Sequence, residues 1–228
     1  MRFACHGVSA FHLPVFEFEA VLFDLSILSQ SFTDVIFTSR QAVTYFFSQS
    51  PEAKERLSHC AFWSIGATTA SRLAQFGLPS NYPINRHDSE TLLELLGDLT
   101  GRHILLVKGQ KGREFLTEQI SQVAELQVLE CYRRRFRPES ELKSMLSAYH
   151  HSPQLIIFSS FAGLLAAMPI FKWRADWMHQ SIITVTNNRM LDWASHQGFA
   201  KLYLVDALTN DALLKTGLSL LGNNEKKG

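Results

Sequence analysis

The chain has 228 residues, of which 46% are hydrophobic and 19% charged, a composition typical of a globular protein with a proper core. Its net charge of +1 at pH 7 gives no overall field that would indicate a nucleic-acid or membrane partner. Cys5, Cys60 and Cys131 lie too far apart for a metal finger or a CxxC motif and fit a reducing cytoplasm. No stretch approaches the ~20 apolar residues of a membrane helix, and no apolar segment typical of a signal peptide opens the chain. We therefore expect a cytoplasmic protein without a metal site.

Short buried strands alternate with amphipathic helices through the first half of the chain. The predicted strands are residues 35–38, 61–65, 103–107 and 127–132, and the predicted helices are residues 42–47, 69–76, 89–96 and 113–123. Glycine and proline end several of these helices, as at Gly77 and Gly97. Such alternation predicts an α/β fold with parallel sheets and helices on both faces.

The second half of the chain repeats this pattern. Three separate pairs of residues lie 121 positions apart without gaps, namely Phe37 with Phe158, Gly77 with Gly198, and Leu92 with Leu213. The alternative is that all α/β chains look alike at this level. We interpret the repeat as two similar flavodoxin-like or Rossmann-like parallel-sheet domains that arose by duplication.

The repeat also predicts domain boundaries. We expect a continuous domain over residues 31–124, a discontinuous domain formed by residues 1–13 and 140–221, a two-stranded linker formed by residues 14–30 and 125–139, and a flexible tail over residues 222–228. A double linker permits hinge motion but restricts twisting.

The last strand, helix and strand of the first domain, at residues 103–132, should also have counterparts 121 residues earlier, in the second domain. Its first strand and most of its first helix would fall before Met1, and only its last strand has a counterpart, near residues 8–13. The expectation is therefore that the natural protein starts upstream of Met1, or that this copy is shortened and less stable.

Hydroxyl side chains follow several of the predicted strands. Ser39 comes after the first strand, Thr68 and Thr69 after the second, and Ser159 and Ser160 after the strand that repeats the first. In parallel α/β sheets ligands bind outside the carboxyl ends of the strands. Such a hydroxyl can cap the next helix, or it can bind a carboxylate together with helix N-terminal amides. Several sites of this kind would suit a polyanionic ligand.

Basic residues accompany these turns, although common catalytic motifs such as GxGxxG, GxxxxGK[ST], HExxH and GxSxG are not found. Arg40, Lys108 and Arg189 lie near the predicted strand ends, and residues 133–137 hold four arginines. That cluster is either a solvated linker face or part of an anion-binding wall. No RNP-type or helix-turn-helix context supports a nucleic-acid role.

Several weak signatures occur together and in order. They are Phe-Thr-Ser-Arg-Gln-Ala-Val at 37–43, Ile-Gly-Ala-Thr-Thr-Ala at 65–70, Ser-Glu-Thr-Leu-Leu at 89–93, the glycine-rich segment at 105–120, the strand at 128–133 with Tyr132, the turn at 158–160, and the terminal helix at 198–214. In this order they resemble the uroporphyrinogen-III synthase family over almost the whole chain from Gly7. The family's opening strand with its "TRP"-like motif is missing. Thr186-Asn187-Asn188-Arg189-Met190 replaces the second "GxxTA" turn, so the role of its threonine cannot be carried over.

The resemblance implies that the protein is a lyase of heme and porphyrin biosynthesis. Its expected activity is to cyclise and dehydrate hydroxymethylbilane, a linear tetrapyrrole with eight carboxylates. Ring D is inverted through a spiro intermediate, giving uroporphyrinogen III. The resemblance also implies a monomer that needs no cofactor and that contacts hydroxymethylbilane synthase transiently.

The resemblance further implies site residues. Tyr132 matches the family's cleft tyrosine, expected to help the substrate hydroxyl depart by hydrogen bonding; otherwise Tyr132 is an ordinary strand aromatic. The expected substrate-binding residues are Ser39, Arg40, Gly66, Thr68, Thr69, Lys108, Ser159, Ser160 and Arg189.

Two other interpretations stay open. One is a catalytically impaired, N-terminally truncated synthase-like protein, and the other is a non-catalytic two-domain protein that binds an anion. Supplying hydroxymethylbilane and resolving the type III from the type I isomer separates all three, because spontaneous closure gives type I.

Overall fold

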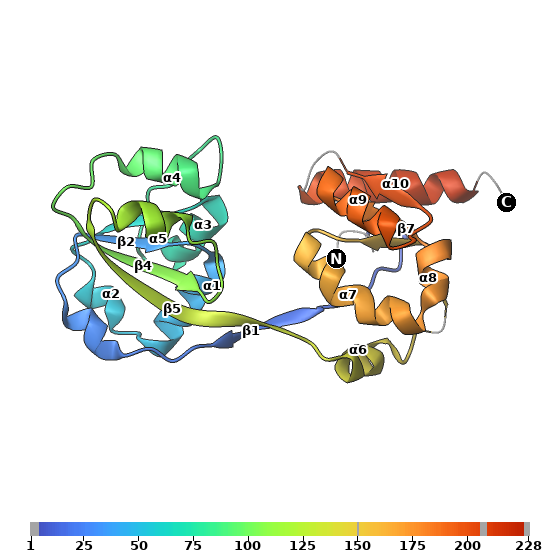
Figure 1. Cartoon of the computed structure of the whole chain (residues 1–228), viewed down its shortest axis with the longest axis horizontal. Coiled ribbons are helices and arrows are strands. Elements are labelled where there is room, and N and C mark those ends of the chain that lie inside the picture. The colour runs from blue at the N-terminus through green and yellow to red at the C-terminus, as the bar shows by residue number, and fades with distance from the viewer. Residues whose placement is uncertain (1–4, 150, 206–208, 226–228) are drawn as a thin grey trace. The chain divides into compact units, whose positions relative to one another are not determined.

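The computed structural model describes residues 5–149, 151–205 and 209–225 (Figure 1). The chain divides into two compact units, unit 1 formed by Met1–Glu17 with Phe136–Gly228, and unit 2 formed by Phe18–Arg135. Both division points fall inside the ranges predicted as linkers, 14–30 and 125–139. Unit 1 is therefore discontinuous in sequence.

Unit 2 is built on a five-stranded sheet with the order β1-β5-β4-β2-β3. The strands are β1 (Phe16–Ala20), β2 (Asp34–Phe37), β3 (Ala61–Ser64), β4 (His103–Gly109) and β5 (Glu125–Phe136). β2 pairs in parallel with β3 and β4, and β4 pairs in parallel with β5. Val21 N–H donates to Cys131 O at 3.0 Å and Arg137 N–H donates to Val15 O at 3.1 Å, so β1 runs antiparallel to β5. The fold is the predicted α/β type, with an antiparallel strand added at one edge.

Helices cover both faces of this sheet. They are the 3₁₀ helix η2 (Leu25–Ser29) and the α-helices α1 (Arg40–Gln49), α2 (Ala53–Arg56), α3 (Ala67–Gln75), α4 (Ser89–Leu96) and α5 (Phe115–Ile120). Because successive strand residues point to opposite faces, Val35 and Phe37 belong to a core with α1 and α3, whereas Ile36 belongs to a core with α4 and α5. The buried runs Asp34–Phe37 and 104–109 follow from this double cover.

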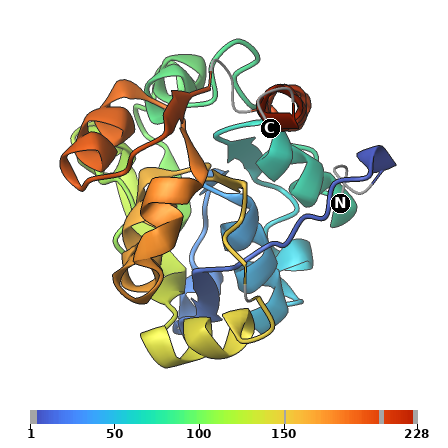
Figure 2. The ribbon, with the colours of Figure 1, turned by 90° about the vertical axis from the view of Figure 1, so that its right-hand side faces the viewer.

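Unit 1 is built on a smaller parallel sheet, β6 (Leu155–Ile157), β7 (Ile182–Val185) and β8 (Leu202–Leu204), in that order. Its helices are α6 (Glu139–Leu146), α7 (Phe161–Trp173), α8 (Ala175–Gln180), α9 (Asn188–His196) and α10 (Asn210–Glu225), several of which face the viewer in Figure 2. One core joins Leu164 of α7, Trp177 of α8, Ile183 of β7 and Met190 of α9.

The predicted repeat is visible element by element. Helices α3 and α9, at Ala67–Gln75 and Asn188–His196, lie 121 residues apart at both ends, as do strands β3 and β7 at Ala61–Ser64 and Ile182–Val185. Gly77 and Gly198 follow α3 and α9 with positive φ angles of 74° and 89°. The two units therefore share a strand-helix topology, as the sequence predicted.

The predicted strand at residues 8–13 is wrong, because residues 8–14 form no strand and β1 begins at Phe16. A strand is defined by its hydrogen-bonded neighbour. In unit 2, β5 pairs with β4, which in turn pairs with β2. In the described part of unit 1, β6 corresponds to β2 and pairs with β7 alone, so there is no strand like β4 with which residues 8–13 could pair. Leu13 instead packs against the core of unit 1 without a ladder.

The predicted tail at 222–228 is also wrong in part, because residues 222–225 continue helix α10. A helix already formed propagates at low cost even through poor helix formers. Residues 226–228 lie outside the described residues.

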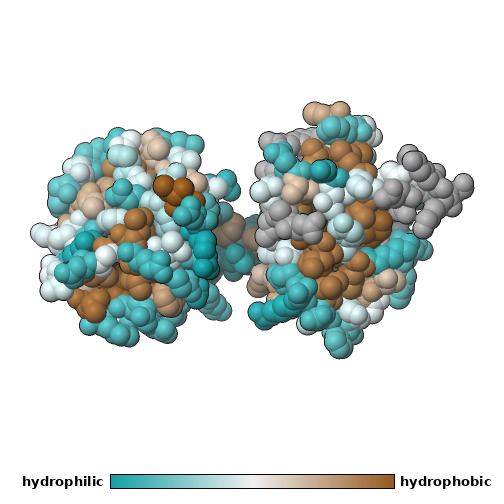
Figure 3. All heavy atoms as spheres, turned by 90° about the horizontal axis from the view of Figure 1, so that it is seen from above, coloured by the Kyte–Doolittle hydropathy of each residue, from teal (hydrophilic) through white to brown (hydrophobic). Residues whose placement is uncertain are grey.

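Apolar and polar residues are intermixed on the visible face of each unit (Figure 3). Large exposed side chains such as Leu22 (87% exposed) and Ile84 (84%) occur in loops. Within the described residues, the apolar helices all fall short of what would be required to cross a lipid bilayer.

Candidate active site

Ser39 and Tyr132 meet at the carboxyl end of strand β2. Ser39 directly precedes α1 in an extended conformation, and its Oγ accepts a hydrogen bond from Ala42 N–H at 3.1 Å. The same Oγ lies 2.9 Å from Tyr132 Oη, which comes from β5, 93 residues further along the chain. The hydroxyl pair is partly buried, which favours hydrogen bonds over competing water.

Aromatic rings hold the side chain of Tyr132. The Tyr45 ring stacks on it with centroids 5.8 Å apart and an interplanar angle of 22°, and the Phe18 ring meets it edge-on at 5.6 Å. Tyr45 Oη donates to Phe18 O at 2.6 Å, which fixes the two neighbours to each other. The Tyr132 side chain is therefore held in one orientation, with its hydroxyl beside Ser39 at the carboxyl end of β2.

A second helix N-terminus lies beside the carboxyl end of β3. Gly66 is the N-cap of α3, and Ala70 N–H donates to its carbonyl at 3.1 Å. A Cβ on Gly66 would come within 2.8 Å of His87 Cβ, so this turn is closely packed. Thr68 is exposed on the first turn, whereas Thr69 is only 4% exposed. The first amides of a helix lack intrahelical partners, so this end suits an anion.

Lys108 lies on the other face of the sheet from Tyr132. Its neighbours Leu106 and Val107 belong to the two opposite cores, which places Lys108 on the α4 and α5 side. Its side chain is 3% exposed, and its ammonium donates to Glu114 Oε1 at 2.7 Å. This hydrogen bond lowers the pKa of Glu114. The geometry thus gives Lys108 a partner within the chain.

The other cations differ in their surroundings. Arg40 is exposed at the start of α1. Arg133 and Arg135 both pair with Glu19, at 2.9 and 2.8 Å. Arg137 pairs with Glu17 at 2.8 Å and with Glu141 at 2.7 Å. Much of the predicted arginine cluster therefore neutralises acidic side chains of β1 and α6.

The unit 1 residues also lie at strand ends. Ser160 is the N-cap of α7, with its Oγ accepting from Gly163 N–H at 3.1 Å, and Ser159 is exposed beside it. Arg189, in the first turn of α9, holds its guanidinium 4.9 Å from the centre of the Phe161 ring. The Phe161 ring in turn meets Trp193 edge-on at 5.5 Å.

The structure thus unites Ser39 with Tyr132 in unit 2, and gathers Ser159, Ser160 and Arg189 at one edge of the unit 1 sheet. Sequence reasoning missed the residues that surround Tyr132 and Gly66, namely Phe18, Tyr45, His87 and Gly109. Of these four residues, only Gly109 could have been found from the sequence, because it lies in the glycine-rich segment at 105–120 that resembles the family pattern. Contacts of Phe18 and Tyr45 with Tyr132 depend on strand pairing, which no local pattern reveals.

Taken together, the fold and the site define a class: a duplicated α/β protein with hydroxyl groups and helix N-termini at the carboxyl edges of its sheets, where such proteins bind ligands. In the described ranges no group of three or more His, Cys, Asp or Glu side chains is placed to hold a metal ion.

A family model described as uroporphyrinogen-III synthase HemD matches residues 2–215. The chain belongs to the uroporphyrinogen-III synthase family. A uroporphyrinogen-III synthase of Salmonella typhimurium is 27% identical over 228 aligned positions, covering 94% of this chain and 92% of that one. Another of Proteus mirabilis is 33% identical over 141 positions, covering 57% of this chain and 70% of that one.

Solved structures share the fold. The crystal structure of uroporphyrinogen-III synthetase from Helicobacter pylori superposes with a TM-score of 0.66 at 18% identity, covering 91% of this chain and 92% of that one. A mutant uroporphyrinogen III synthase of Thermus thermophilus gives 0.55 at 17% identity, covering 92% and 88%. The α/β fold predicted from the sequence is therefore the fold of this family.

Proposed function

We propose that this chain performs the family's reaction, the cyclisation and dehydration of hydroxymethylbilane to uroporphyrinogen III with inversion of ring D, at the site around Tyr132 and Ser39. The observation that carries the proposal is their 2.9 Å hydroxyl contact at the end of β2, in a chain that matches the family model over residues 2–215. A phenol held at a fixed point can donate a proton to a leaving hydroxyl group.

The chemistry places modest demands on the protein. Departure of the terminal hydroxyl as water leaves an electron-deficient azafulvene, because a pyrrole nitrogen supplies the electron pair. The substituted carbon of the last pyrrole attacks to give the spiro intermediate, which fragments and recloses with ring D inverted. Since the pyrroles provide the electrons, the protein mainly orients the chain ends and assists the leaving group.

Ser39 has a defined part in this step. Its Oγ already accepts from Ala42 N–H at 3.1 Å, so its own proton is free to be donated to Tyr132 Oη. A phenol oxygen that accepts from Ser39 keeps its proton for the substrate hydroxyl. Ser39 thereby orients the proton of Tyr132 toward the substrate.

The carboxylates of the substrate would bind at the helix N-termini. Arg40, Gly66, Thr68 and Thr69 lie at the starts of α1 and α3, whereas Ser39 would act on the substrate through Tyr132. Ser159, Ser160 and Arg189 lie at the starts of α7 and α9. Amide dipoles and hydroxyls can hold anions without a large net positive charge. Lys108 would contact a carboxylate after its ammonium leaves Glu114.

The isomer assay tests the activity. Freshly prepared hydroxymethylbilane is supplied to the purified chain, and the type III and type I products are separated by chromatography. We expect type III to predominate, because spontaneous closure gives type I. Type I alone, at the uncatalysed rate, would overturn the proposal, and binding of the bilane without type III would indicate a binding protein.

Tyr132→Phe tests the role of the phenol. We expect kcat to fall about 100-fold or more, with the melting temperature nearly unchanged because the ring remains packed. Tyr203→Phe is the matched control, since Tyr203 lies on β8 with 40% of its surface exposed. Equal turnover of wild type and Tyr132→Phe would remove Tyr132 from the mechanism.

The proposal extends to the setting of the enzyme. We expect a cytoplasmic monomer that contacts hydroxymethylbilane synthase transiently, in keeping with the free thiols of Cys5, Cys60 and Cys131. Sedimentation of the purified chain, alone and with that synthase, measures both associations. A stable dimer at micromolar concentration would contradict the monomer.

A further inference from the structure

The pairing of β4 with β5 is irregular beside Tyr132. The two strands run in register up to Lys108 opposite Glu130, and then Gly109 lies opposite Tyr132. One residue of β4 therefore faces two of β5, and Cys131 is the extra residue, fully buried at 0% exposure. Such bulges redirect side chains and occur next to active sites.

The bulge places the Tyr132 ring against the backbone of Gly109. In an unbroken register Tyr132 would lie opposite Gln110 instead, one residue further along β4. Gln110 N–H donates to Tyr132 O at 2.8 Å, so the shifted pairing is itself hydrogen-bonded. The tyrosine thus lies beside the residue of β4 that has no side chain.

There is no room for a side chain at that position. A Cβ on Gly109 would lie 2.4 Å from Tyr132 Cζ, 2.7 Å from Cε2 and 2.8 Å from Oη. Carbon atoms pack at about 3.5–4.0 Å, so the phenol would have to move by on the order of 1 Å. The Tyr45 and Phe18 rings occupy two other sides, and the movement would strain the hydrogen bond to Ser39.

We infer that Gly109 is a positioning residue for the reaction: by lacking a side chain opposite the bulge at Cys131, it lets the Tyr132 phenol reach Ser39. The inference rests on the proposed function, because Gly109 acts only through the phenol. The three atoms nearest to the added Cβ all belong to the phenol of Tyr132 and none to the backbone.

Four proteins test the inference: wild type, Gly109→Ala, Tyr132→Phe and the double variant. We expect Gly109→Ala to lower kcat about tenfold or more with little change in KM, as a displacement near 1 Å does for a catalytic group. In the Tyr132→Phe background the same substitution should leave kcat unchanged, because no phenol remains to be displaced. An equal loss of kcat in both backgrounds, or full activity of Gly109→Ala, would overturn the inference.

Gly112→Ala is the matched control. It adds the same methyl group three residues further along, after the end of β4, but its Cβ would meet Gly109 O at 3.2 Å and Lys108 Cε at 3.5 Å rather than Tyr132. We expect its kcat to stay within about twofold of wild type. A loss as large as that of Gly109→Ala would show that the loop, not the phenol, is responsible.

A second variant keeps the test decisive if Gly109→Ala folds poorly. Ser39→Gly removes the hydroxyl at the other end of the hydrogen bond, and glycine is tolerated at an N-cap. Ser39→Gly should lower kcat in the wild-type background but not in the Tyr132→Phe background. If Ser39→Gly lowers kcat equally in both backgrounds, the position of the Tyr132 phenol does not explain the loss. Failure of the proposed function is distinguishable, since wild type would then yield only type I.

Discussion

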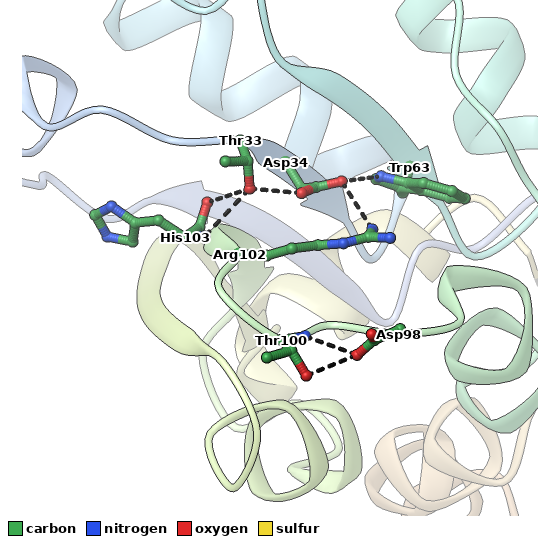
Figure 4. A network of polar contacts seen from close by, with 7 residues as sticks. All are labelled: Thr33, Asp34, Trp63, Asp98, Thr100, Arg102 and His103. Atoms are coloured by element: carbon green, nitrogen blue, oxygen red, sulfur yellow. Dashed lines mark hydrogen bonds and ion pairs between the residues drawn. The ribbon is translucent and has the colours of Figure 1, made fainter.

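Asp34 carries a carboxylate that is only 4% exposed, at the amino end of β2 (Figure 4). Trp63 Nε1 donates to it at 2.7 Å, Thr33 Oγ1 at 2.6 Å, and Arg102 pairs with it at 3.3 Å. A buried charge is tolerated when it is hydrogen-bonded in this way. The network lies at the edge of the sheet opposite Ser39 and contributes to stability rather than to the reaction.

Asp34→Ala should therefore lower the free energy of unfolding by about 1–3 kcal/mol, because it leaves the partly buried indole N–H of Trp63 without its acceptor. Urea unfolding followed by tryptophan fluorescence measures the change. Asp98→Ala is the control, since Asp98 is exposed and accepts hydrogen bonds from neighbouring Thr100 in a turn. A loss for Asp34→Ala no greater than for Asp98→Ala would contradict the assignment.

The thiols of Cys60 and Cys131 should resist modification. Burial raises the pKa of Cys60 to about 11 and that of Cys131 to about 12, from 9.0, and the thiolate is the reactive form. At pH 7 a disulfide reagent should label the exposed Cys5 in the folded protein, and the other two only after denaturation. Rapid labelling of all three would contradict the burial.

The same shifts give a pH dependence. Because the folded pKa values lie above the unfolded ones, the folded state holds these protons more tightly, and unfolding releases them at high pH. The stabilisation is complete below about pH 9 and is lost as the pH rises toward 11–12. Unfolding free energies measured at pH 7, 9 and 10 should fall less for a Cys60→Ala variant than for wild type.

At the scale of elements, the helices α1, α4, α7 and α9 begin at side chains that accept one of their first amides. Ser39, Asp88, Ser160 and Asn187 each accept from the N–H three residues later, at 2.9–3.1 Å. For Ser160 the two alternatives, capping and ligand binding, are therefore compatible, because the cap leaves the hydroxyl proton available. The Ser39 hydroxyl instead shares a hydrogen bond with Tyr132 Oη. Glycine at positive φ ends α3 and α9 in the same manner.

Gly198→Ala and Gly222→Ala should have opposite effects on stability. Gly198 has φ of 89° with nothing within 4 Å of an added Cβ, so alanine costs about 1 kcal/mol through the backbone alone. Gly222 lies within α10 with equal space around it, where alanine should stabilise by about 0.5–1 kcal/mol. Thermal denaturation measures both, and a shift of the same sign in the two variants would contradict the helix assignments.

At the scale of the whole molecule, each unit has its own apolar core. Leu106 is buried among residues of unit 2, and Leu164 is buried among residues of unit 1. Chains with two cores often unfold in more than one step. The stability of this protein is therefore best described separately for each unit.

Leu106→Ala and Leu164→Ala should each destabilise one unit, by about 2–5 kcal/mol for a truncated core leucine. Calorimetry of the full chain should show that each variant lowers a different part of the unfolding transition. A single transition displaced equally by both would show that the two units unfold together.

Local patterns were sufficient for the architecture. Alternating strands and helices, and pairs such as Gly77 and Gly198 separated by 121 residues, predicted two similar α/β units, because periodicity and turn chemistry are properties of neighbouring residues. The predicted strand at 8–13 was wrong because a strand needs a partner, and partners are set by the fold rather than by the segment.

For the site, the sequence by itself determined which turns carry hydroxyls and that Tyr132 lies on a strand. Only the tertiary structure decided that Tyr132 meets Ser39 at 2.9 Å, that Gly109 lies against its ring, and that Lys108 pairs with Glu114. The physical reason is strand register. A bulge of one residue decides which side chains face each other across a sheet, and the chain reveals it only when the strands are paired.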